Sequence, residues 1–266
     1  MKFSLDYWDV KVKRDVVSEE ELVNLGVPQQ SLQFQTVRGP RVVLPQVQAN
    51  GTQVPMLTPV GLIAYQLFPY VNATQTEVNG LDLGFETHVD VAHLGRFTAT
   101  LNYSHMFHYN LTAPTGVTSD LAGTHGPTGV SGDTGNPRDR AVLTLGWERG
   151  PWEATATVNY IGAFSLTDPS IGIDTCGESI LSEDRWVGVY TGPESFCKVD
   201  RFADVDLYTE YAFSDHFKVH GSILNVFDKP PPLDLQTYGS AGNYDNAFHD
   251  AGAVGRFFSI GATYTF

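Results

Sequence analysis

The sequence predicts an all-β protein in which about eight antiparallel strands form part of the wall of a transmembrane β-barrel. Three observations predict this fold class. Apolar and polar residues alternate with period two in blocks of about ten residues. Short turns alternate along the chain with long loops rich in Gly, Pro, Asn and Ser, and aromatic residues gather where the blocks end. A soluble β-sandwich usually has turns of mixed, modest length at both ends, so the lopsided connections favour a membrane barrel.

Each expected strand is identified by its alternation. The clearest case follows Pro151, where every second residue from Trp152 to Tyr160 is apolar or aromatic and the residues between them are Glu, Thr and Asn. The eight expected strands cover residues 2–12, 78–91, 95–109, 139–149, 151–164, 202–213, 216–227 and 255–266. The short turns at 93–94, 150 and 214–215 are expected on the periplasmic side, and the long loops at 13–77, 110–138, 165–201 and 228–254 on the extracellular side.

The aromatic residues can be compared with the thickness of a bilayer. From Phe97, beside a short turn, to Phe107, near a long loop, the strand advances about 33 Å at roughly 3.3 Å per residue. A tilt of about 40° reduces this to about 25 Å, the height of the apolar band of an outer-membrane barrel. Asp204, Asp206 and Glu210 share the opposite face of their strand, as expected for a hydrated lumen.

Composition excludes several other function classes. The chain has 266 residues, a formal charge of −14 and a pI near 4.8, which argues against nucleic-acid binding. Two cysteines cannot build a disulfide-rich scaffold or a Cys-based zinc site. No nucleophile elbow, P-loop or H-E-x-x-H motif occurs, so we expect no enzyme, no catalytic residue and no cofactor. His105 and His108 should lie on opposite faces of one strand, so no metal site is expected there.

Four segments resemble the TonB-dependent outer-membrane receptors. Residues 224–232 (LNVFDKPPP) resemble the exit of the family's penultimate strand, carried by Asn225, Phe227 and Asp228. Residues 255–266 (GRFFSIGATYTF) resemble its final strand, carried by Gly255, Arg256, Tyr264 and Phe266. Residues 79–89 and 5–13 resemble two further strands of the family. The resemblance covers nearly the whole chain, and its last two strands are the most specific part.

This resemblance implies a location, a function and partners. It implies the last strands of a 22-stranded barrel in the bacterial outer membrane, whose loops capture a scarce ligand such as a ferric siderophore, cobalamin or a glycan. Family members use energy delivered through TonB to a plug domain. No plug, TonB-contacting segment or signal peptide is recognised in residues 1–266, so a truncated product is expected. The implied partners are outer-membrane lipid, the missing barrel strands and plug, and a small-molecule ligand, with TonB acting only through the plug.

Two other functions stay open at this stage. A self-closed eight-stranded outer-membrane barrel could have a structural or adhesive role, and it requires residues 2–12 to pair with residues 255–266. A soluble β-barrel could act as a binding module, and it would be purified without detergent. In both cases the apolar faces must be covered, by lipid or by a core.

The long loops contain the remaining candidate residues. Cys176 and Cys197 lie in one loop on the expected extracellular side, where a disulfide is favoured and would constrain the loop by roughly 3 kcal/mol. Loop side chains suited to siderophores and sugars are the candidate ligand contacts: Trp186, Tyr190, Phe196, Tyr238, Tyr244, Phe248 and His249.

Overall fold

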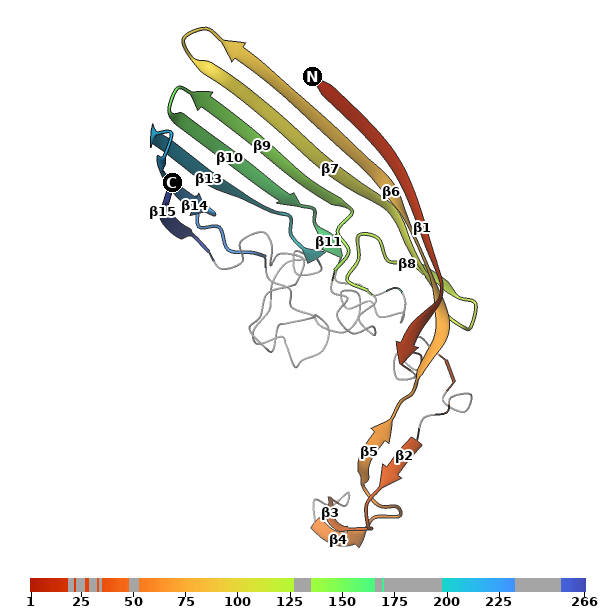
Figure 1. Cartoon of the computed structure of the whole chain (residues 1–266). Helices are drawn as coiled ribbons and strands as arrows, with labels where there is room; N and C mark the ends of the chain where they lie inside the picture. The colour runs from red at the N-terminus through yellow and green to blue at the C-terminus, as the bar shows by residue number, and fades with distance from the viewer. Residues whose placement is uncertain are drawn as a thin grey trace.

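A computed structural model describes residues 1–18, 22, 27–28, 33, 35–47, 53–126, 135–165, 169, 198–232 and 255–266. Figure 1 shows one curved, open sheet in which eight strands follow one another. In order across the sheet these are β1 (Lys2–Ser18), β6 (Tyr70–Val91), β7 (Gly95–Thr112), β9 (Asp139–Arg149), β10 (Trp152–Ile161), β13 (Phe202–Ser214), β14 (Phe217–Leu224) and β15 (Phe257–Tyr264). Every neighbouring pair is antiparallel, so the eight predicted strands and their class are confirmed.

The two edges of this sheet are β1 and β15. Within the described ranges, these strands form no ladder with each other, so the pairing required by a self-closed eight-stranded barrel is not seen. Also among the described residues, no helix is long and apolar enough to cross a membrane.

The regions expected to be loops contain further strands, which corrects the predicted boundaries. β1 continues to Ser18 and β6 already begins at Tyr70. The additional strands are β2 (Gln35–Arg38) with β5 (Ile63–Leu67), β3 (Val43–Val47) with β4 (Gln53–Leu57), β8 (Thr118–Asp120) beside β7, and β11 (Phe164–Ser165) with β12 (Lys198–Val199). These strands lie outside the apolar blocks, and a strand in water needs no strict apolar alternation, so the periodicity did not reveal them.

Among the described residues, buried apolar side chains are few, and they lie at the long-loop end of the sheet. One cluster joins Ile161, Phe164, Val199 and Phe202. The other joins Val17 of β1, Leu22 further along the chain, Leu111 of β7, and Ala113 and Leu121 of the loop after β7. By contrast, large side chains of the sheet are exposed, including Ile260 at 86% and Phe258 at 63%. An exposed apolar surface of this extent does not fit a soluble domain folded around its own core.

Candidate functional site

The strand register sorts the side chains of the sheet onto two faces. One row of directly paired residues runs through Phe97, Trp147, Ala154, Thr209, Gly221 and Ile260. The next row runs through Ala99, Leu145, Ala156, Leu207, Ile223 and Phe258. Paired residues of an antiparallel ladder point to the same side, so these rows define a continuous apolar face, and the intervening residues define the polar face.

The polar face carries carboxylates, hydroxyls and amides that bind one another. Ser104 Oγ donates to Asp82 Oδ1 at 2.5 Å, and Lys218 Nζ donates to Glu210 Oε1 at 2.8 Å. A hollow of about 450 Å³ on this face includes Asp6, Asp82 and Arg140 in its lining. The described residues contain no group of three or more side chains placed to hold a metal ion. The surface can therefore exchange hydrogen bonds with water or a polar solute, as expected for a lumen.

The character of the apolar face reverses along β1 and β6. Tyr7 pairs with Leu81, but two residues further on, on the same side, Asp9 pairs with Asn79 and Lys11 pairs with Glu77. Lys11 Nζ lies 2.6 Å from Glu77 Oε1. The reversal coincides with a register shift between Asn79 and Gly80 in the ladder with β7. Transfer of charged side chains into hydrocarbon is energetically costly, so the apolar band ends at the level of these charged residues.

The β-bulge at this level also corrects the expectation for the two histidines. His105 pairs across from Leu81 and His108 pairs across from Asn79, so Phe107 is the extra residue and both rings lie on one face. Each histidine has its own carboxylate. His105 Nδ1 lies 2.7 Å from Asp139 Oδ1, and His108 Nδ1 lies 3.0 Å from Asp120 Oδ2.

Asp120 fixes the first part of the loop after β7. Its carboxylate accepts hydrogen bonds from the backbone N–H groups of Tyr109 at 3.0 Å and Ala122 at 3.1 Å. Burial raises the pKa of Asp120, but these N–H groups, the His108 ring and Arg138 outweigh it, so the pKa lies below its usual value. The neighbouring Leu121 is fully buried, so the loop is anchored by both charge and packing.

Four of the C-terminal signature residues form one turn. Asn225 is fully buried at a φ of 46°, and its side chain both donates to the Lys229 carbonyl O at 2.9 Å and accepts from the Lys229 N–H at 3.0 Å. Asp228 Oδ1 accepts from the backbone N–H of Arg256 at 2.9 Å, just after Gly255 at a φ of 87°. The turn therefore ties the exit of β14 to the entry of β15.

Phe227, Tyr264 and Phe266 are the remaining signature residues. Phe227 is 73% exposed, and Tyr264 contacts Phe266 edge to face with ring centroids 5.1 Å apart. The cysteines and the candidate ligand contacts lie outside the described residues: Cys176, Cys197, Trp186, Tyr190, Phe196, Tyr238, Tyr244, Phe248 and His249. The sequence analysis did not identify Asp120 as an anchor of the loop. The signal available in the sequence was an aspartate directly before an apolar residue, Leu121.

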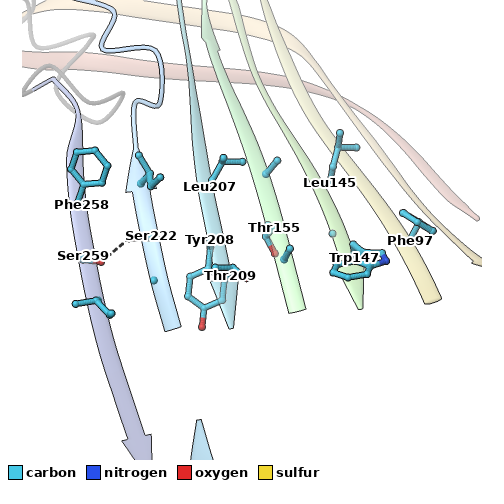
Figure 2. A pocket seen from close by; sticks show the side chains of 16 residues that line it. Phe97, Leu145, Trp147, Thr155, Leu207, Tyr208, Thr209, Ser222, Phe258 and Ser259 are labelled. Atoms are coloured by element: carbon cyan, nitrogen blue, oxygen red, sulfur yellow. Dashed lines mark hydrogen bonds between the residues drawn. The ribbon is translucent and has the colours of Figure 1, made fainter. Parts of the chain in front are cut away.

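Aromatic side chains gather at the short-turn end of the apolar face. Trp147 Nε1 donates to the Leu94 carbonyl O at 2.8 Å, and the Trp152 and Tyr211 rings meet edge to face at 4.6 Å. Beside them lies a hollow of about 650 Å³. Figure 2 shows Phe258 at one side of this hollow and Phe97 and Trp147 at the other. Tyrosine and tryptophan at one level of an apolar wall are typical of a membrane interface.

Comparison with known proteins gives one family match and several structural likenesses. A family model described as "TonB dependent receptor-like, beta-barrel" matches residues 3–226. No curated protein matches the sequence. The siderophore receptor PirA from Acinetobacter baumannii is 13% identical with a TM-score of 0.49, and the match covers 99% of this chain and 29% of PirA.

Two further solved structures are similar at the same level. A mutant of the ferric enterobactin receptor PfeA from Pseudomonas aeruginosa is 15% identical, with a TM-score of 0.48 and coverage of 99% of this chain and 29% of PfeA. The FrpB iron transporter from Neisseria meningitidis is 16% identical, with a TM-score of 0.46 and coverage of 88% of this chain and 27% of FrpB. The chain thus spans less than a third of the length of these proteins.

Proposed function

This chain belongs to the TonB-dependent receptor-like β-barrel family, a family of bacterial outer-membrane proteins and not of enzymes, and from that membership we propose that it forms part of the barrel wall of an uptake receptor. The ligand class is a scarce compound carried across the outer membrane, with a ferric siderophore as the first candidate and cobalamin or a glycan as the others. The observation that carries the proposal is the continuous apolar face opposite a hydrogen-bonding polar face, held in register over eight strands.

We propose that residues 1–266 are a partial barrel domain whose two edges are completed by other strands. An unpaired edge in hydrocarbon leaves backbone N–H and C=O groups without partners, at several kcal/mol each. β1 and β15 are the outermost strands of the main sheet. Pairing with the remaining strands of a larger barrel removes both edges. From the family membership we further propose that a plug domain is a partner in the complete receptor and that TonB acts only through that plug.

We propose that the polar face lines the lumen and that the long loops contact the ligand. The lumen side offers Asp82, Ser104 and Arg140 as hydrogen-bonding groups for a hydrated, polar solute. The loop aromatics and the disulfide between Cys176 and Cys197 stay predictions, and they belong to the extracellular side in this proposal. Thiol labelling before and after reduction checks the disulfide, since a bonded pair reacts only after reduction.

An uptake assay tests the function. Cells making the complete receptor that contains this chain are given radiolabelled iron loaded on enterobactin, and separately radiolabelled cobalamin. We expect accumulation of one probe, lost in a strain without TonB and in one without the receptor. Accumulation that is independent of TonB would contradict the proposed mechanism, and no accumulation of either probe would exclude ferric enterobactin and cobalamin as ligands.

A further inference from the structure

We propose that the apolar face carries a fixed binding site for one glycerophospholipid of the periplasmic leaflet, with an acyl chain in the hollow near the short turns and the phosphate on Arg149. This inference rests on the proposed placement of the apolar face in lipid. It goes beyond uptake, because the site lies on the side of the wall away from the lumen.

The shape of the hollow is set by residue size across one row. Its floor is made by the small residues Ala154, Thr209 and Gly221, which are directly paired on β10, β13 and β14. Larger side chains surround this floor: Phe97, Leu145, Trp147, Leu207, Ile223, Phe258 and Ile260. The volume of about 650 Å³ is within the range of about 300–1,000 Å³ that is usual for small-molecule pockets.

The chemistry of the floor suits a hydrocarbon chain. Ala154 and Gly221 bring no polar side-chain atom, and the Thr209 hydroxyl donates to the Glu153 carbonyl O at 3.2 Å. The floor therefore presents no unsatisfied side-chain donor to an apolar occupant. A second copy of the chain would need side chains shaped to fill the depression, whereas an acyl chain adapts to it and is already present in the membrane.

A cation stands at the depth expected for a headgroup. Arg149 pairs directly with Trp152, which pairs with Tyr211, so these three residues form the row next to the hollow on the short-turn side. Arg149 is exposed, and no ion pair among the described residues includes it. An arginine at this level can extend its stem along the apolar wall and bind a phosphate with its planar guanidinium.

The neighbouring charged residues belong to alternate rows of the ladders, although they line a rim hollow together with Arg149. Asp90, Arg96 and Glu148 lie on the polar face, because Asp90 pairs with Arg96 and Arg96 pairs with Glu148 in the alternate rows. Arg96 Nε is bound to Asp90 Oδ1 at 2.9 Å. Among the residues that the structure describes, Arg149 is thus the charged side chain on the lipid-facing side of the row next to the hollow, which provides the charge complementarity for an anionic headgroup.

Native mass spectrometry of the purified, delipidated receptor, titrated with phosphatidylglycerol, tests the site. We expect one saturable lipid. Gly221→Leu, whose new Cβ meets nothing closer than the Ser259 carbonyl O at 3.5 Å, fills the hollow and weakens binding at least about tenfold. Arg149→Gln weakens phosphatidylglycerol by about tenfold but leaves diacylglycerol, which lacks the phosphate, unchanged. Arg96→Gln is the matched control and keeps wild-type binding.

Two further measurements keep the test decisive. Ala154→Leu fills the same floor from β10 and replaces Gly221→Leu if that variant does not fold. Wild-type binding that never saturates, equal binding by all variants, or a dimer that forms through this face would overturn the proposal. TonB-dependent uptake by Gly221→Leu should equal that of the wild type, so loss of the lipid site and failure of the uptake proposal give different results.

Discussion

The two sides of the sheet end differently at the long-loop rim. β1, β6 and β7 are 17, 22 and 18 residues long and continue past the level where the apolar face becomes charged. β14 and β15 have only 8 residues each. The turn built on Asn225 and Asp228 links the end of β14 to the start of β15. A strand that continues into water must change which face is polar, whereas a strand that stops needs a turn that satisfies its own backbone.

The reversal in the long strands is itself a measure of the membrane boundary. On β6 the apolar positions of the lipid-facing side run from Val89 to Leu81, which is about 26 Å along the strand and about 20 Å after a tilt of about 40°. Beyond them the same side carries Asn79 and Glu77. The band inferred from Phe97 to Phe107 is longer because His105, and not Phe107, is the partner of Leu81, so Phe107 lies two residues beyond this level.

The largest effect is expected for a charge placed on either side of this boundary. Leu83→Arg puts a cation in the apolar band of β6 and should reduce the free energy of unfolding by about 2–4 kcal/mol. Asn79→Arg, on the same face beyond the boundary, is the matched control and should cost about 0–1 kcal/mol. Denaturant unfolding of the receptor in bilayers measures both. Equal losses would place the boundary elsewhere.

The turn that ends the short strands should be the next most sensitive feature. Asn225→Ala removes two side-chain hydrogen bonds with Lys229 from a fully buried position and places alanine at a φ of 46°. We expect a loss of about 2–3 kcal/mol in unfolding free energy. Phe227→Ala, at a 73% exposed site two residues away, should change it by less than about 0.5 kcal/mol. A larger loss for Phe227→Ala would show that packing, and not the buried amide, holds this turn.

A smaller, pH-dependent effect is expected at the Asp120 anchor of the long strands. Because the folded-state pKa of Asp120 is lowered, its stabilisation is fully present above the unfolded value of about 3.9 and is lost as the pH falls through the lower folded value. Asp120→Asn should therefore speed amide hydrogen exchange at Tyr109 and Ala122 about fivefold near neutral pH, for a loss of about 1 kcal/mol.

The same substitution should have almost no effect at acid pH, where the wild-type carboxylate is protonated as well. Asp90→Asn, at the opposite rim, is the control and should leave these two amides unchanged, because Asp90 binds Arg96 and not the loop. An Asp120→Asn effect that persists at low pH would mean that the hydrogen-bond geometry matters more than the charge.

The sequence was sufficient for features that depend on period-two alternation. The eight strands of the main sheet follow from it because a barrel wall needs one apolar and one polar face, and from Trp152 to Tyr160 the alternation is unbroken. The signature at Asn225, Asp228, Gly255 and Arg256 was recognised from its letters, but its physical role as a hydrogen-bonded turn needed coordinates. The letters of a turn do not give the partner of each N–H group.

The features that escaped prediction depend on long-range pairing. The bulge at Phe107 is defined only by the register between β6 and β7. This register pairs residues that are far apart in the sequence, such as Asn79 and His108. Among the short strands, β3 pairs with β4 and places Pro45 opposite Pro55, a composition more typical of loops. The hollow depends on Ala154, Thr209 and Gly221 meeting in one row, which no single strand contains.

The central claim is that this sheet is a membrane wall with lipid on one face only, and that on β6 the lipid-facing part ends at Leu81. A nitroxide scan of β6 tests it most directly, with Cys176 and Cys197 replaced by Ser and single cysteines placed from 77 to 89 in the complete receptor. We predict that positions 81, 83, 85, 87 and 89 collide preferentially with oxygen, that positions 82, 86 and 88 collide with a water-soluble reagent, and that 77 and 79 join the water-exposed group. Water exposure at every position, or oxygen preference that continues through 79 and 77, would contradict the account.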